Sequence, residues 1–147
     1  MSANKLADDE LARWTASQAA IRYYFLIDRE RFREAADLFS ADGEFLRLGA
    51  TLHGPDEVFA ALDGPRTGRV ARHFVHNLVI DLDGDDKATA SYDLATYGQD
   101  PSDDPSVVPA IPPPTAVLDC TDALVRSSGE WRIAKKSVKA VWRGSAR

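Results

Sequence analysis

The apolar positions in the first third of the chain are spaced as in amphipathic helices. From Asp8 they recur at steps of three and four, which predicts one long helix over 8–28 with an inward stripe of Leu11, Trp14, Gln18, Ile21 and Phe25. A second, shorter helix is predicted over 31–39, after a loose terminus at 1–5. A third is predicted over 54–62, because a proline suits the first helical turn and the acids that follow face the positive end of the helix dipole.

The rest of the chain alternates between apolar and polar residues, which is typical of strands. A short strand is predicted over 44–48, between the second and third helices. Two hairpins follow, each joined by a turn of Asp, Ser and Gly residues, with strands over 70–82, 87–98, 116–126 and 131–142. Between the hairpins, 101–115 holds six of the eight prolines and is expected to be an irregular surface excursion. The order of elements predicts an α+β fold.

The register of the first hairpin decides which side chains share a face. A three-residue turn places Asp83 opposite Lys87, and one face then becomes almost wholly apolar: Phe74, His76, Leu78, Ile80 and Leu82 with Ala88, Ala90, Tyr92 and Leu94. The other face gathers a polar wall that contains His73, Asn77, Asp93 and Tyr97, with Asn77 directly across from Asp93. We expect this wall to bind substrate, covered by the first helix with Asp28 and Tyr24.

The composition fits one soluble globular domain over 1–147, with a core of about 8–142. Hydrophobic residues make up 44% of the chain, enough for a sizeable core. The net charge of -5 and the lack of a Lys/Arg run leave no positive surplus for phosphates, so nucleic acid is not an expected partner. No apolar stretch approaches the roughly 20 residues that span a bilayer. The single cysteine, Cys120, cannot form an intramolecular disulfide, so we expect a cytoplasmic protein without a membrane partner.

The carboxylate at the end of the first predicted helix is the most informative candidate residue. Asp28 projects from the side expected to be buried, where an ionised group is costly unless it is paired or hydrogen-bonded. His73 is a natural partner, because histidine exchanges its proton near neutral pH. With Tyr24 or Asn77 as a hydrogen-bond donor to a developing oxyanion, this pair could transfer protons during catalysis. Two structural alternatives stay open: Asp28 could cap the second helix, and His73 could be a satisfied structural histidine.

Other polar residues have simpler interpretations. Asn77 and Asp93 could form only a cross-strand hydrogen bond. His76 is expected in the core or in a subunit interface, and a solvated face is expected for the row Lys135, Lys136 and Lys139. No metal site is expected, because residues three apart on a strand, such as His73 and His76, point to opposite faces. Since the chain has no phosphate-binding glycine loop and no nucleophile elbow, no cofactor is expected either.

Five short segments, taken together in their order and spacing, are specific for one fold family. They are 22–28 (RYYFLID), 37–43 (DLFSADG), 72–77 (RHFVHN), 83–85 (DGD) and 129–134 (GEWRIA). In these segments the chain resembles the SnoaL-like branch of the NTF2-like superfamily, which includes scytalone dehydratase, bile acid 7α-dehydratase and polyketide cyclases. The resemblance implies an α+β cone, in which a curved antiparallel sheet wraps a long N-terminal helix with two further short helices. It assigns the dehydratases' helix-end aspartate to Asp28, their nearby tyrosine to Tyr23 and their catalytic histidine to His73.

The residues and the resemblance together predict a cofactor-independent dehydratase or isomerase acting on a small hydrophobic carbonyl compound, such as a steroid, polyketide or aromatic intermediate. Two alternatives remain: a non-catalytic ligand-binding or dimerising module of the same fold, and a ketosteroid-isomerase-like enzyme with Asp28 or Asp93 as the base. We also expect a homodimer or larger homo-oligomer, because the register leaves an outer apolar patch of Phe74, Leu78, Ile80 and Leu94. If the two faces are reversed, these residues line the pocket instead.

Overall fold

The computed structural model describes residues 2–64 and 70–144, and residues 1, 65–69 and 145–147 of the predicted domain lie outside the described residues. The helices are α1 (Ala3–Ile27), α2 (Phe32–Ala36) and α3 (Gly54–Leu62). The strands are β1 (Phe39–Arg47), β2 (Ala50–His53), β3 (Val70–Asp83), β4 (Lys87–Gln99), β5 (Ala116–Ser127) and β6 (Glu130–Arg143). The three predicted helices and both hairpins are confirmed. The short strand β2 was not predicted, and β1 begins at Phe39, where the pattern predicts the end of a helix.

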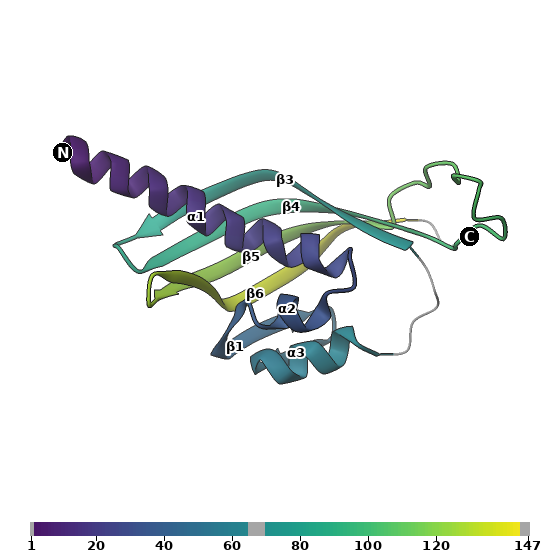
Figure 1. Cartoon of the computed structure of the whole chain (residues 1–147), viewed down its shortest axis with the longest axis horizontal. Coiled ribbons are helices and arrows are strands. Elements are labelled where there is room, and N and C mark those ends of the chain that lie inside the picture. Colours follow the sequence, from purple (N-terminus) through teal and green to yellow (C-terminus); the bar gives the residue numbers. More distant parts are fainter. Residues whose placement is uncertain (1, 65–69, 145–147) are drawn as a thin grey trace.

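The six strands form one curved sheet in the order β2-β1-β6-β5-β4-β3. Neighbouring strands are antiparallel except for β1 and β6, which pair in parallel. Helix α1 runs diagonally across one face of the sheet, and α2 and α3 lie beside β1 (Figure 1). The predicted cone, a curved sheet around a long N-terminal helix, is confirmed. No described helix combines the length and apolar character needed to cross a membrane.

Helix α1 begins earlier than predicted and packs on the sheet through a different face. It begins at Ala3, because the Ser2 hydroxyl accepts a hydrogen bond from the Lys5 backbone N–H. All five residues of the predicted inward stripe are exposed, and the buried residues are Ala12, Ala16, Ala19, Ala20, Tyr23, Tyr24 and Leu26. The predicted stripe was therefore wrong. Alanines have the same helical spacing and let the helix approach the sheet closely, which the bulkier side chains would prevent.

A β-bulge in β3 corrects half of the predicted face assignment. Asp83 does pair with Lys87, as predicted, and Ile80 lies opposite Ala90. The register then shifts between His76 and Val79, where Asn77 has a φ of 53°. Beyond this point the side chains that face α1 are His73 and Val75, whereas Phe74 and His76 point outward and are exposed. Because of the extra residue, His73 shares the inner face with Ile80, which the predicted register puts on the opposite face, and His76 lies exposed on the outer face.

A second register shift, in β6, places a lysine inside the protein. Leu124 pairs with Ile133 and Ala123 pairs with Lys135, so Ala134 is an extra residue in β6. Lys136, which simple alternation places on the solvated face, is instead 0% exposed. The predicted solvated row is thus wrong for this lysine, while Lys135 and Lys139 are exposed as expected.

Candidate active site

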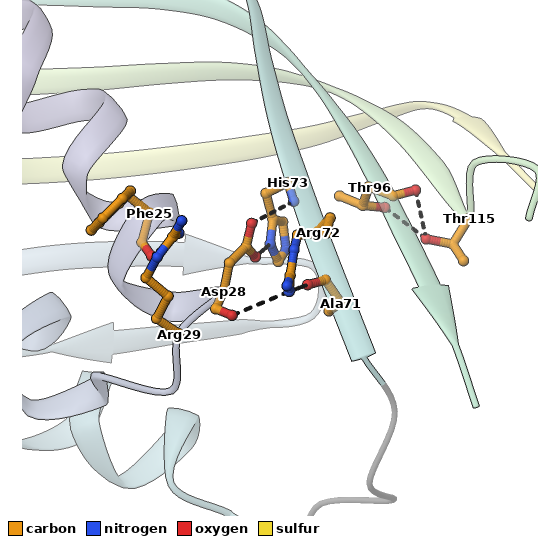
Figure 2. A network of polar contacts seen from close by, with 8 residues as sticks. All are labelled: Phe25, Asp28, Arg29, Ala71, Arg72, His73, Thr96 and Thr115. Carbon is orange, nitrogen blue, oxygen red and sulfur yellow. Dashed lines mark hydrogen bonds and ion pairs between the residues drawn. The ribbon is translucent and has the colours of Figure 1, made fainter. Parts of the chain in front are cut away.

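Asp28 and His73 meet where the end of α1 reaches the start of β3. The Asp28 Oδ1 atom lies 2.6 Å from Nδ1 of His73, and Oδ2 accepts a hydrogen bond of 2.9 Å from the His73 backbone N–H. Figure 2 shows this arrangement, with the carboxylate reaching from the last turn of the helix to the strand. The Asp28 side chain is only 7% exposed and that of His73 20%. Because both carboxylate oxygens act as acceptors, Nδ1 carries the hydrogen in the neutral imidazole, and in that form Nε2 has the lone pair.

The helix end itself is tied to the same strand. The Arg72 guanidinium donates a hydrogen bond of 3.3 Å to the Asp28 backbone carbonyl oxygen and one of 2.7 Å to the Ala71 carbonyl oxygen. A cation suits this position, because the carboxyl end of a helix carries partial negative charge. Asp28 is not an N-cap, since α2 begins after Arg31 and has no side-chain cap. Its side chain positions His73, and the capping alternative is wrong.

A cavity of about 600 Å³ lies between α1 and the sheet, with His73 in its wall. Most of its lining is aliphatic or aromatic, from α1, α3 and the strands of the sheet. The polar side chains that line it are Tyr23, Tyr24, Arg47, His73 and Thr96. His73 Nε2 has no hydrogen bond to any described residue, so it is available to a bound molecule. An apolar cavity with a few convergent polar groups is the usual form of a small-molecule site.

Next to the cavity, which Tyr24 also lines, lies a buried polar cluster that the sequence did not predict. Lys136 Nζ donates hydrogen bonds to Asp122 Oδ2 at 2.6 Å and to the Tyr92 hydroxyl at 2.8 Å. The Tyr92 hydroxyl donates to Asp122 Oδ2 at 3.1 Å and lies 3.2 Å from the Tyr24 hydroxyl. The ammonium is also enclosed by aromatic rings, at 4.7 Å from the centroid of Tyr23 and 4.9 Å from that of Tyr24.

The hydrogen-bond directions in this cluster distinguish the two tyrosines of α1. A phenol has one hydrogen, and that of Tyr92 goes to Asp122, so Tyr92 accepts from both Lys136 and Tyr24. The Tyr24 proton is therefore committed to Tyr92. Tyr23 has no hydrogen bond to a described residue, and Asp122 Oδ1 is the one fully enclosed side-chain polar atom of the described residues that lacks a partner. The Tyr23 hydroxyl is therefore accessible from the cavity that Tyr23 lines.

Burial keeps these phenols in their neutral, proton-donating form. Desolvation raises the pKa of Tyr23 above the usual value for tyrosine, and the positive charge of Arg47 opposes part of this rise. Burial likewise raises the pKa of Tyr24 and of Tyr92. The same cause raises the pKa of the Cys120 thiol to about 12, which disfavours the reactive thiolate form. Among the described residues, no group of three His, Cys, Asp or Glu side chains could hold a metal ion.

The SnoaL-like domain profile matches residues 10–137 of the chain. The chain belongs to the SnoaL-like domain family. Comparison of this SnoaL-like protein with curated proteins gives no match.

Solved structures show the fold of this SnoaL-like protein in related chains. Aln2 from a Streptomyces species is 24% identical over 86% of this chain and 88% of its own, with a TM-score of 0.69. A candidate scytalone dehydratase from Novosphingobium aromaticivorans is 17% identical over 97% and 93%, with a TM-score of 0.76. An NTF2-like protein with a cystatin-like fold, also from Novosphingobium aromaticivorans, is 23% identical over 97% and 87%, with a TM-score of 0.74. At these identities the likeness establishes the NTF2-like fold alone.

The structure brings together four of the seven predicted site residues of this SnoaL-like protein and separates the other three. Asp28 lies against His73, and Tyr23, Tyr24 and His73 line the same cavity. Asn77, Asp93 and Tyr97 do not share a wall with His73. They lie on the outer face, where Asn77 Nδ2 donates a 2.8 Å hydrogen bond to Asp93 Oδ2 and Tyr97 packs edge-on against Phe74. The predicted polar wall is wrong because the bulge in β3 separates its members.

The three residues that the sequence analysis missed had unequal signals. Asp122 follows Leu118 and Cys120 at strand spacing and precedes Leu124, so alternation alone puts a carboxylate in an apolar row. Lys136 depends on the bulge at Ala134, which no residue type in the sequence marks. Arg47 shares a face with Phe45 by alternation, but the predicted strand gave no sign that this face lines a cavity.

Proposed function

We propose that this protein is a cofactor-independent acid/base enzyme, a dehydratase or isomerase, that acts on a small hydrophobic carbonyl compound such as a steroid, polyketide or aromatic intermediate. The observation that carries the proposal is the contact between Asp28 Oδ1 and His73 Nδ1 in the wall of an apolar cavity. It leaves Nε2 as a base with a fixed tautomer, in a space of about 600 Å³ that suits a compound of two or three rings.

The proposed reaction moves one proton from the α-carbon of the substrate to another atom of the same molecule. His73 Nε2 removes a proton from the carbon α to the carbonyl, and the electron pair of that C–H bond forms an enolate. Asp28 stabilises the resulting imidazolium, and the Tyr23 hydroxyl donates a hydrogen bond to the enolate oxygen. In a dehydratase the enolate then expels the β-hydroxyl, which takes the proton from His73 and leaves as water. In an isomerase the proton returns to a different carbon.

The geometry favours histidine over a carboxylate as the base. Both oxygens of Asp28 already accept hydrogen bonds from His73, so neither is directed at a substrate. Asp93 lies on the outer face and bonds to Asn77. These contacts support the roles of a positioning group for Asp28 and a surface residue for Asp93.

The test is proton exchange at the carbon next to a carbonyl. 1-Tetralone incubated with the protein in D2O should lose its α-proton signals in the NMR spectrum, and 3-hydroxy-1-tetralone should give 1-naphthol and water. His73→Gln should slow both reactions by about 10²- to 10⁴-fold. His76→Gln is the matched control, because that histidine is exposed on the outer face of the same strand. Wild-type rates in His73→Gln would refute the proposal, and binding without exchange in the wild-type protein would favour a ligand-binding module.

A homodimer through the outer sheet face and a cytoplasmic location stay predictions. The residues expected at the dimer interface need correction, because Leu78, Ile80 and Leu94 face α1 and only Phe74 points outward. Phe74 is 50% exposed on that face, and Val79, farther along the same strand, is 54% exposed, which supports an interface of different composition.

A further inference from the structure

Arg47 is the charged side chain that lines the cavity at the end away from His73. It is the last residue of β1, where strand alternation puts it on the same face as buried Phe45, and the residue itself is exposed at the cavity's edge. Strands β1 and β3 are separated in the sheet by β6, β5 and β4. Between them, the Tyr23 ring packs against Phe45 at 6.0 Å, whereas the Tyr24 ring packs against His73 at 5.3 Å. The cavity thus has an arginine on the Tyr23 side and a histidine on the Tyr24 side.

The Arg47 guanidinium has no carboxylate partner among the described residues. It lies against the Phe45 ring, at 5.7 Å from the centroid. Other arginines of the chain form ion pairs, for example Arg31 with Glu34 and Arg132 with Glu130. None of the described cavity-lining residues is an Asp or Glu. The positive charge of Arg47 also lowers the pKa of the Tyr23 hydroxyl, against the effect of burial. The lining therefore presents uncompensated positive charge.

We propose that the substrate carries a carboxylate, which Arg47 binds while the carbonyl oxygen lies at Tyr23 and the α-carbon at His73. This assignment rests on the proposed function for the last two contacts, but the recognition of the anion by Arg47 does not. A guanidinium suits this role because its planar donors match the two oxygens of a carboxylate. The substrate class is then a hydrophobic carbonyl acid, whose apolar body fills the aliphatic lining.

The test compares two ligands of nearly equal shape, 1-naphthylacetate and its neutral amide, 1-naphthaleneacetamide. Calorimetric titration at about pH 8 and low salt should show the acid binding about tenfold more tightly than the amide to the wild-type protein. Arg47→Met should remove this preference and leave the affinity for the amide unchanged. The control is Arg13→Met, which removes the same charge from an exposed pair with Glu10 on α1, away from the cavity lining. It should keep the full preference.

Two results would overturn the assignment of Arg47. The first is equal or undetectable binding of both ligands by the wild-type protein, and the second is an acid preference that persists in Arg47→Met. His73→Gln separates this proposal from the catalytic one. If Arg47 binds the anion, His73→Gln keeps the preference for the acid whether or not it loses proton exchange. A preference that disappears in His73→Gln and persists in Arg47→Met would instead assign the anion to a protonated histidine.

Discussion

The buried pair of Lys136 and Asp122 predicts a large and specific effect on stability. Both side chains are 0% exposed, and their charged atoms lie 2.6 Å apart. Lys136→Met would leave the Asp122 carboxylate buried with one remaining hydrogen-bond donor, Tyr92. Removing one partner of a buried ion pair costs about 3–5 kcal/mol, a large share of the roughly 5–15 kcal/mol that stabilises a typical domain.

The assay is urea unfolding followed by tryptophan fluorescence. With a slope of about 1–3 kcal/mol per M, Lys136→Met should lower the urea midpoint by about 2 M. Lys139→Met is the matched control on the same strand, and because Lys139 is exposed the change should stay within about 0.5 kcal/mol.

A double variant separates charge from packing. Lys136→Met combined with Asp122→Val removes both charges, so it should recover most of the lost stability. The residual cost should be about 1 kcal/mol, because the Tyr92 hydroxyl loses its acceptor. In the wild-type protein Asp122 Oδ1 already lacks a hydrogen-bond partner, so replacing the ion pair by apolar groups should cost even less stability. A loss below about 1 kcal/mol in the single variant, or equal losses in the single and double variants, would refute the electrostatic explanation.

Two further predictions concern the buried phenols and the thiol. Tyr23→Phe should slow α-proton exchange by about 10²- to 10³-fold with little change in stability. Tyr24→Phe should instead cost about 1 kcal/mol of stability and change the exchange rate only a few-fold. The opposite pattern of effects would reverse the roles of the two tyrosines. Folding raises the pKa of Tyr23, Tyr24 and Tyr92, and that of Cys120 to about 12, so the folded state keeps protons that the unfolded state releases. Stability should therefore fall as pH rises above about 9, by about 1.4 kcal/mol per pH unit for each group ionised only on unfolding. Urea midpoints between about pH 8 and 11 measure this loss, and tyrosinate absorbance from the three buried phenols in protein that keeps its native circular dichroism would contradict it.

The helices and hairpins could be predicted because local signals determine them. Pro55 and the acids after it mark the start of α3, and the turn at Gly84 places Asp83 opposite Lys87 as its length predicts. The buried face of α1 could not be read from hydrophobicity alone. Alanine is weakly apolar, and its value at Ala16 and Ala20 lies in the close approach that it permits between helix and sheet.

The candidate site was predicted in part, because its two catalytic candidates were chosen for their chemistry and not from the register of the hairpin. Asp28 lies at a helix end and is a costly group to bury, so its need for a partner is evident from the residue alone. His73 was chosen for its chemistry, and its predicted face matched the cavity although the assignment of its neighbours did not. Asn77, Asp93 and Tyr97 were placed by strict alternation, which fails once one extra residue is inserted in β3.

The two bulges have the same consequence for the interior of the cone. In a regular strand, residues an odd number of positions apart lie on opposite faces. Because of the shift at Asn77 in β3, His73 and Ile80 both face inward although they are seven residues apart. In β6 the extra residue Ala134 brings Lys136 inward three residues after Ile133. Each bulge therefore places one ionisable side chain in an otherwise apolar row without interrupting the rest of that row. His73 and Lys136 are also connected through two tyrosines. The Tyr24 ring packs on His73, the Tyr24 hydroxyl is hydrogen-bonded to that of Tyr92, and Lys136 donates a hydrogen bond to the same Tyr92 hydroxyl.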